Sequence, residues 1–182
     1  MATAISSKED RYAAAKLVLS RIAHPVAIIG AAHGDERSCA TGTVMYVSHS
    51  PAMVAVALHP GSRTCRLVQQ SREFSVSLLH DAQQELAVAA GRSGEGPDKF
   101  AALKIPVADQ PDFKAPAVDG SIAMLWCRVV DERAVGDHIL FVGELIGSVV
   151  NDRKIDALLR YRRRYMRMGH WTSDEAPEGY PT

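Results

Sequence analysis

Apolar residues near the start of the chain recur at the spacing of a helix. Tyr12, Ala15, Leu19 and Ile22 follow one another at three- and four-residue intervals with charged residues between them, which predicts one amphipathic helix. This helix is expected to end at His24, because the residue before a proline is pushed out of the helical region.

Most later apolar runs are short and are separated by turn residues, which predicts β-strands. The predicted strands span residues 26–32, 53–58, 74–78, 121–130 and 139–150, and another β-rich run precedes Pro51. The run at 53–58 is apolar on both faces and is therefore expected to be a buried strand. Turns between paired strands are expected at 33–36 and 134–138, where glycine and aspartate are found.

Two helices are expected between these strands. Ser62 stands where an N-cap belongs, and residues 63–71 have helical spacing. A second helix is expected after the capping pair Asp81 and Gln84, with Gly91 closing it.

The rest of the chain is expected to add little regular structure. Residues 98–100 start a brief helical turn, residues 104–119 form a loop with one brief strand, and residues 154–160 form a short helix. Many short strands with few helices argue for a β-barrel or a β-sandwich. The glycine-rich fingerprint of dinucleotide-binding folds is absent, which disfavours a Rossmann fold.

Length and charge limit the classes of protein and of partner. The 182 residues suffice for one domain with a sizeable core. We expect a flexible N-terminus at residues 1–7, the domain at 8–171 and a flexible tail at 172–182. Lys plus Arg and Asp plus Glu both total 21, so no net field attracts the chain to nucleic acid or to an anionic membrane, and neither is expected as a partner.

Cysteines and histidines give no sign of disulfides or metal. Cys39, Cys65 and Cys127 are odd in number and widely spaced. No signal peptide and no apolar run long enough to span a bilayer is present, so we expect reduced thiols in a cytoplasmic protein. The seven histidines lack the spacing of metal ligands, and no metal site is expected.

One turn has the features of an anion site. A strand ends at His59, and Ser62, Arg63 and Thr64 then open a helix. The first backbone N–H groups of a helix are free, the helix dipole is positive there, and these three side chains add donors. Taken alone, the same residues also fit an ordinary capped helix.

The order of several short motifs resembles one known family. The motifs are Ala40-Thr41-Gly42-Thr43, a strand closed by Ser50-Pro51-Ala52, Ser62-Arg63-Thr64, Asp98-Lys99-Phe100 and Gly136-Asp137-His138. In this order they resemble the flavin reductase-like, FMN-binding split-barrel family over roughly residues 15–169. The resemblance implies a mainly β fold, an antiparallel Greek-key split barrel with a few flanking α-helices.

The resemblance also implies where the ring of a flavin binds. Ala40, Thr41, Gly42 and Thr43 align with the segment that borders the isoalloxazine in the family, although Gly42 stands where a serine is common. Without the resemblance, these residues also fit a plain solvent-side strand.

Two further segments are implied to bind the cofactor. Ser62, Arg63 and Thr64 match the phosphate-binding turn of the family. Lys99 and Phe100 match its Lys-Phe pair, with Lys99 as a partner of the phosphate; taken alone, Lys99 also fits a solvated lysine.

The triplet at residues 136–138 is implied to be catalytic. By itself it is ordinary hairpin chemistry. In the family it lies beside the flavin, so we expect His138 to shape the nicotinamide pocket and to supply a proton, with Asp137 orienting it.

Five arginines cluster near the end of the chain. They are Arg160, Arg162, Arg163, Arg164 and Arg167. A nucleic-acid patch is the rival interpretation, but the chain is neutral and few aromatic residues lie among the arginines. The resemblance favours one or two functional arginines, with Arg164 expected to bind the cofactor, and a solvated remainder.

The resemblance implies an NAD(P)H-dependent flavin reductase. It would be a homodimer that binds FMN, or alternatively FAD, uses NADH or NADPH as co-substrate, and supplies reduced flavin to a partner monooxygenase. Two alternatives stay open: an FMN-binding redox or electron-carrier protein without efficient NAD(P)H oxidation, and a non-catalytic dimer that has kept the barrel but lost the flavin.

Overall fold

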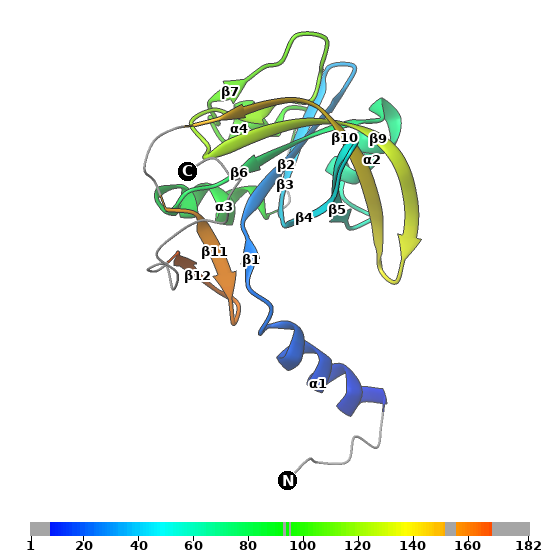
Figure 1. Cartoon of the computed structure of the whole chain (residues 1–182), viewed down its shortest axis with the longest axis vertical. Helices are drawn as coiled ribbons and strands as arrows, with labels where there is room; N and C mark the ends of the chain where they lie inside the picture. The colour runs from blue at the N-terminus through cyan, green and yellow to red at the C-terminus, as the bar shows by residue number, and fades with distance from the viewer. Residues whose placement is uncertain (1–7, 93, 95, 152–155, 169–182) are drawn as a thin grey trace.

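The computed structural model of the chain describes residues 8–92, 94, 96–151 and 156–168 (Figure 1). Its centre is a seven-stranded antiparallel sheet in the order β3-β2-β6-β9-β10-β5-β4. These strands are, in chain order, β2 (Ala27–His33), β3 (Glu36–Gly42), β4 (Val44–His49), β5 (Ala52–Leu58), β6 (Glu73–Leu78), β9 (Ala123–Val135) and β10 (His138–Val150).

The two edge strands of this sheet are consecutive in the sequence. β3 ends at Gly42 and β4 begins at Val44, so only Thr43 separates them. A sheet whose first and last strands are joined by one residue has to curl on itself, and β3 accordingly also contacts β5, the neighbour of β4. The result is a barrel that stays open along one seam, which confirms the predicted mainly β, antiparallel split barrel.

Tight turns set the register of the two hairpins that were predicted from glycine and aspartate. Gly34 has φ +57°, and His33 pairs with Glu36 across β2 and β3. Gly136 has φ +62°, and His138 pairs with Val135 across β9 and β10. A positive φ at the first turn residue is the geometry of a type II′ turn, which glycine adopts without strain.

Helix α2 (Arg63–Ser71) closes one side of the barrel core, within the bounds predicted for it. Its apolar face packs against β2 and β3, with Cys65, Leu67 and Val68 buried beside Phe74 and Phe141 of the sheet. Helix α2 therefore has a fixed position, because moving its first turn would open the core beneath it.

A second core cluster lies on the other side of β2 and β3. It is covered by α3 (Gln84–Ala90) and by the short helix α4 (Lys99–Ala102), which follows the predicted start at Asp98. The helix predicted to begin with Asp81 and Gln84 starts differently. A 3₁₀ turn, η1 (Asp81–Gln83), precedes α3, and the His80 N–H donates to Gln83 Oε1 at 3.2 Å.

The region near residue 160 is a small sheet, so the short helix predicted at 154–160 was wrong. Strands β1 (His24–Pro25), β11 (Leu158–Tyr161) and β12 (Arg164–Arg167) form a three-stranded sheet in the order β1-β11-β12. Leu158 is buried in the second core cluster. Pairing with the distant β1 and with β12, which follows directly in the sequence, has overridden the local helical preference of this stretch. Residues 152–155 lie outside the described part.

The first helix, α1 (Lys8–Leu19), projects from the body of the molecule (Figure 1). The predicted helix exists but ends at Leu19, before Ile22 and His24. Its apolar side chains do not pack on the barrel: Tyr12 is 65% exposed and Val18 is 67% exposed. The described part of this chain therefore leaves these apolar side chains of α1 exposed.

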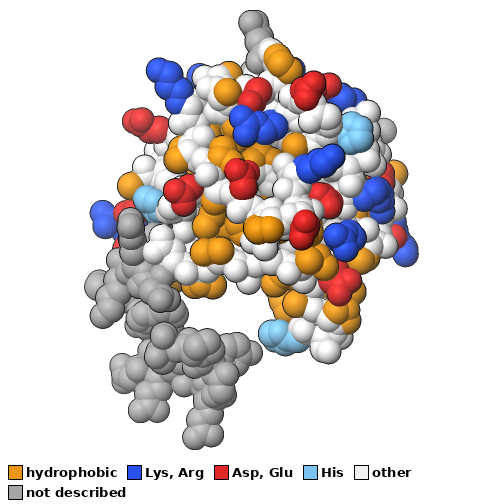
Figure 2. Space-filling view, turned by 90° about the horizontal axis from the view of Figure 1, so that it is seen from above, with side chains coloured by type: hydrophobic (Ala, Val, Ile, Leu, Met, Phe, Trp, Pro, Cys, Tyr) orange, Lys and Arg blue, Asp and Glu red, His pale blue; other side chains and the backbone are white. Residues whose placement is uncertain are grey.

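The remaining loop is more ordered than expected. Two brief strands, β7 (Val107–Ala108) and β8 (Ala117–Val118), pair with each other where one strand was predicted. Seen from above, the molecule presents positive and negative side chains interspersed among apolar ones (Figure 2). Among the described residues, no helix has the length and apolar character needed to cross a membrane. The expected flexible ends at residues 1–7 and 172–182 lie outside the described part and stay predictions.

Candidate functional site

A pocket of about 310 Å³ opens beside the start of α2. Three segments line it: Ser38 to Ala40 of β3, Gly61 to Thr64 before and at the helix start, and the stretch after α3 that includes Arg92 and Gly94. Lys99 lies at its base. The sequence predicted the helix start; Ser38, Arg92 and Gly94 were not predicted, because only the fold brings them to it.

The helix start supplies donors that the helix itself does not use. The Cys65 N–H donates to Ser62 Oγ at 3.1 Å, and the Arg66 N–H donates to the Ser62 carbonyl at 3.2 Å. Among the described residues, this leaves the N–H groups of Arg63 and Thr64 available to a ligand. The buried Thr64 hydroxyl lies 3.0 Å from the Ser38 hydroxyl, so one of the two donates to the other and one hydroxyl hydrogen remains as a donor in the wall.

Arg63 spans the mouth of the pocket. Its guanidinium donates to the carbonyl oxygen of Gly96 and, at 3.3 Å, to that of Gly94. These acceptors are neutral, and among the described residues Arg63 forms no ion pair with a carboxylate. An anion in the pocket would meet both the helix start and this guanidinium.

Lys99 is buried and holds backbone segments together. Its Nζ donates to the carbonyl oxygens of Cys39, Ala90 and Arg92 at 2.9, 2.6 and 2.6 Å. Burial lowers the pKa of Lys99, and the positive charge of Arg63 lowers it further. An ammonium has three hydrogens, and all three are used here, so Lys99 contributes its charge to the pocket rather than a free donor.

Phe100 lies in the second core cluster and does not line the pocket. A Cβ on Gly30 would stand 3.2 Å from its ring and 2.1 Å from the Pro116 carbonyl. Phe100 therefore packs against the back of β2, where only glycine leaves enough room.

Asp98 and Arg37 anchor the stretch between α3 and α4. Arg37 Nε donates to Asp98 Oδ2 at 2.9 Å, and the Ala101 N–H donates to Asp98 Oδ1 at 3.0 Å. Burial opposes ionisation of Asp98, but these hydrogen bonds outweigh it and hold the pKa of the carboxyl below its ordinary value. The far wall of the pocket is thereby tied to β3.

The next residues of β3 lead out of the pocket to the seam of the barrel. Ala40 lines the pocket, whereas Thr41, Gly42 and Thr43 border a separate groove of about 170 Å³. The Thr41 hydroxyl donates to the Ala87 carbonyl at 2.5 Å, so it is already engaged. With about 3.3 Å per residue, the pocket and the groove open roughly 10 Å apart along one strand.

Residues 97–99 cover part of the outer edge of β3, and among the described residues only the end of this edge, at Thr41, is left to pair with a ligand. β3 has a strand partner on one side only. The Arg37 N–H and the Cys39 carbonyl both point to the free side, since they bond Pro97 and Lys99 there. Alternation along an antiparallel strand directs the N–H and C=O of Thr41 to the same side. A flat ring with donors and acceptors on its rim can pair with such an edge.

His138 lies at the tip of the long β9–β10 hairpin. Its Nδ1 is 2.8 Å from Asp137 Oδ1, and this contact holds the pKa of the exposed Asp137 carboxyl below its ordinary value. The ring of His59 lies 6.0 Å from that of His138, edge to face. His59 Nδ1 in turn accepts from the Gly61 N–H at 3.1 Å, so the hairpin tip adjoins the turn that opens α2.

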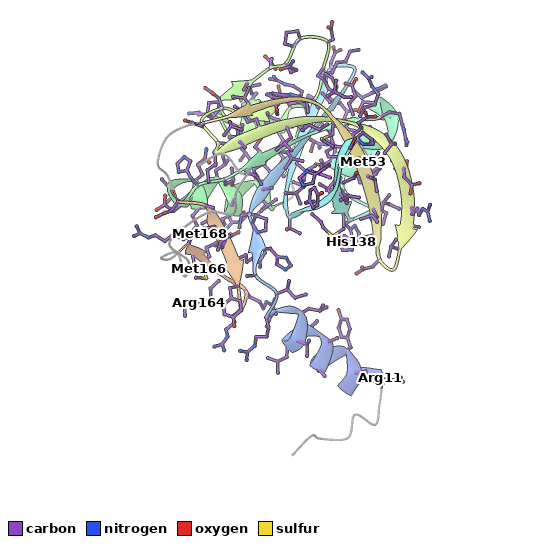
Figure 3. The ribbon with its side chains drawn as sticks, in the orientation of Figure 1. Arg11, Met53, His138, Arg164, Met166 and Met168 are labelled. Atoms are coloured by element: carbon purple, nitrogen blue, oxygen red, sulfur yellow. The ribbon has the colours of Figure 1, made fainter. Side chains whose placement is uncertain are left out.

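The predicted site residues thus fall into separate places within one chain. Ala40, the helix-start turn and Lys99 meet at the pocket; the segment from Thr41 to Thr43 borders the adjacent groove. Figure 3 shows His138 on the hairpin at the right and Arg164 on the small sheet at the lower left, well apart from each other. Arg164 is exposed on β12 and lines neither the pocket nor the groove.

The chain matches the family described as "Flavin reductase like domain" over residues 19–169. It belongs to this family. The match covers the whole barrel, the helix-start pocket and the small sheet, and it confirms the family resemblance of the motifs.

Individual relatives agree with this membership. The chain is 32% identical over 155 residues to the reductase component of a 4-nitrophenol 4-monooxygenase/4-nitrocatechol 2-monooxygenase from Rhodococcus opacus, covering 85% of this chain and 78% of the relative. It is 29% identical over 149 residues to an NADH:riboflavin 5'-phosphate oxidoreductase from Streptomyces pristinaespiralis, covering 81% and 82%. A solved structure of nitrilotriacetate monooxygenase component B from Mycobacterium thermoresistibile has a TM-score of 0.79 at 28% identity, covering 93% and 98%.

Proposed function

We propose that this protein is an NAD(P)H-dependent flavin reductase that binds FMN and supplies reduced flavin to a partner monooxygenase. The observation that carries the proposal is the pocket at the start of α2, in a chain of the flavin reductase family. One relative is named an NADH:riboflavin 5'-phosphate oxidoreductase, and another is named a monooxygenase reductase component. FAD, which also carries a phosphate next to its flavin, is the alternative cofactor.

The residues of the pocket fit the phosphate end of a flavin. The N–H groups of Arg63 and Thr64 point from the positive end of the helix dipole, and the guanidinium of Arg63 and the buried charge of Lys99 add to the positive potential. In the described lining of the pocket there is no carboxylate to repel an anion.

The seam of the barrel fits the ring. The free edge of β3 at Thr41 offers backbone donors and acceptors, and small residues at Gly42 and Thr43 leave the approach open. An added Cβ at Gly42 would meet only Ile29 Cγ1, at 3.5 Å. Thr41 and its neighbours therefore hold a flat ring in place mainly through the backbone.

A flavin bound here supplies the acceptor for the hydride of the nicotinamide. The chain positions the reactants and controls protons. Asp137 orients the His138 imidazole by accepting from Nδ1, which leaves Nε2 free of this contact and available to a reactant. His59 packs edge to face against His138 and fixes the hairpin tip beside the phosphate turn.

We also propose a homodimer. Edge strand β4 exposes three consecutive large apolar residues: Met45 is 60% exposed, Tyr46 59% and Val47 42%. An uncovered apolar edge strand favours association, and a second copy of the chain is a partner that is always present.

The buried free thiols of the described structure support a reducing compartment, which we take to be the cytoplasm.

The test is a flavin titration followed by oxidation assays with NADH and with NADPH. Protein that binds FMN and oxidises either nicotinamide in its presence supports the reductase. Protein that binds flavin but is inert toward both nicotinamides supports a redox carrier instead. Protein that takes up no flavin at any concentration overturns the proposal altogether.

A further inference from the structure

A row of side chains crosses one face of the small sheet. The register pairs His24 with Arg160 and Arg160 with Tyr165, so the three side chains are direct neighbours. The Arg160 guanidinium lies 5.8 Å from the centre of the Tyr165 ring. All three line the groove that reaches the segment from Thr41 to Thr43.

His24 and Arg160 also line a second cleft, of about 200 Å³, next to this groove. The end of α1 forms one wall with Leu19, Ser20 and Ile22, and the turn between β11 and β12 forms the other. The Arg162 N–H donates to the Ser20 carbonyl at 2.7 Å, which ties the two walls together. The groove and the cleft are therefore two parts of one elongated depression that starts at the barrel seam.

Three guanidinium groups line this cleft without an acidic partner. In the part of the chain that the structure describes, Arg160, Arg162 and Arg163 form no ion pair with a carboxylate. Five other arginines each face an aspartate or a glutamate: Arg37, Arg66, Arg72, Arg133 and Arg167. Other arginines in the described part, such as Arg92 and Arg128, also form no ion pair, so what distinguishes these three is that they line one cleft. In a chain of zero net charge, three such guanidinium groups in one cleft form a local site for an anion.

The backbone presents two of these arginines at a conformational cost. Arg162 and Arg163 occupy the two central positions of the turn with φ of +50° and +64°. Such a turn favours Asn-Gly, because both residues must adopt the left-handed region. The Arg162 guanidinium also lies 5.4 Å from the centre of the Tyr161 ring, which restricts its orientation.

We propose that this cleft binds the phosphate groups of an adenine dinucleotide, whose reactive half extends along the groove toward Thr41–Thr43. The identity of the ligand rests on the proposed reductase function; the anion site itself does not. Two dinucleotides share the chemistry, the nicotinamide co-substrate and FAD. The site is concave and joins the barrel seam, which favours a small nucleotide over a nucleic acid backbone.

The first experiment measures binding of ADP-ribose and of 2′-phospho-ADP-ribose to the full chain by calorimetry, without flavin. Arg160→Gln is expected to weaken binding about tenfold, the scale of one lost charge-assisted hydrogen bond. The double variant Arg162→Asn, Arg163→Gly removes two charges and installs the favoured turn. It should lose at least as much affinity while its melting temperature stays the same or rises, which separates binding from folding.

Arg128→Gln is the matched control. Arg128 is exposed on β9 and lies over the Phe113 ring at 5.6 Å, as Arg162 lies over Tyr161, but it is outside the cleft. Its substitution should leave the affinity for ADP-ribose unchanged.

The ligand series identifies the source of the phosphates. If the cleft variants lose more affinity for 2′-phospho-ADP-ribose than for ADP-ribose, the cleft is assigned to NADPH. If they lose affinity equally for both, it is assigned to the pyrophosphate of either nicotinamide dinucleotide. If they lose affinity for FAD and retain affinity for FMN, it is assigned to FAD. Equal affinity of the parent and both cleft variants for every one of these ligands overturns the proposal. Tight binding of duplex DNA that is lost in the same variants, with no binding of ADP-ribose, overturns it in favour of a nucleic-acid patch. Because ADP-ribose contains neither flavin nor nicotinamide, failure of the reductase assay leaves this result interpretable.

Discussion

The most direct test of the phosphate pocket is the substitution Arg63→Ala. Arg63 is the first residue of α2 and spans the pocket mouth, where its guanidinium donates to the carbonyls of Gly94 and Gly96. An alanine at this position keeps the helix and the N–H group of residue 63, because alanine is the best helix former. The variant therefore removes the guanidinium and leaves the backbone donors of the helix start in place.

The size of the effect follows from the contacts that Arg63 exchanges. A hydrogen bond between the guanidinium and an anionic phosphate contributes about 1.5–3 kcal/mol. The two bonds that Arg63 gives up or rearranges have neutral carbonyl acceptors and contribute less. We expect FMN to bind more weakly by about 1–3 kcal/mol, which corresponds to roughly a 5- to 150-fold rise in the dissociation constant. Riboflavin has no phosphate and should bind the parent and the variant equally.

The assay is a fluorescence titration of FMN and of riboflavin against the parent, Arg63→Ala and a control, Arg66→Ala. Arg66 lies one turn along the same helix and forms an exposed ion pair with Glu36 at 2.6 Å, outside the pocket. Such an exposed ion pair contributes about 0–1 kcal/mol to stability, so the control should fold as the parent does. Because Arg66 lies outside the pocket, the control should also bind FMN as the parent does. An unchanged FMN dissociation constant in Arg63→Ala, or an equal loss for riboflavin, would refute the assignment of this turn to the phosphate.

Four other outcomes follow from the structure. His138→Ala should slow NADH oxidation by more than it weakens FMN binding, since His138 lies outside the phosphate pocket; equal turnover would make it structural. Lys99→Met should lower the free energy of unfolding by about 2 kcal/mol or more in urea titrations, because three carbonyls lose their donor. The affinity for FMN should fall more than that for riboflavin, because the pocket also loses a positive charge; an equal change for both flavins would make the role of Lys99 purely structural. Burial raises the pKa of Cys127 from 9.0 to about 12. The stability that the neutral thiol contributes is therefore intact below pH 9 and is lost as the pH rises toward 12. Over this range the unfolding free energy of Cys127→Ala should fall less steeply than that of the parent. Met45→Asp on the exposed β4 edge should yield monomers in analytical ultracentrifugation, whereas Val88→Asp on α3 should not; a dimer in both places the interface elsewhere.

Some of this protein was determined by the sequence alone, because the cause lies within a few residues. Gly34 and Gly136 set their hairpins through a positive φ that other residues avoid. Ser62 caps α2 through its own hydroxyl, so the start of the helix was predictable, and with it the position of the anion site that we propose there. The order of these local motifs was also enough to indicate the family, which the match over residues 19–169 confirms.

Other features were decided by the tertiary structure, because their causes are contacts between distant segments. Strand β11 pairs on one side with β1, which lies near the other end of the chain. From the sequence alone, Lys99 also fits a solvated lysine. The fold instead buries it among carbonyls of β3, of the end of α3 and of the stretch after α3. The seam at Thr43 exists because the sheet order brings consecutive strands to opposite edges, and the arginine cleft exists because the end of α1 meets the β11–β12 turn. Local steric effects act over a few residues and can therefore be predicted from the sequence. Burial and strand pairing depend on which distant segments the folded chain brings together, so they cannot be.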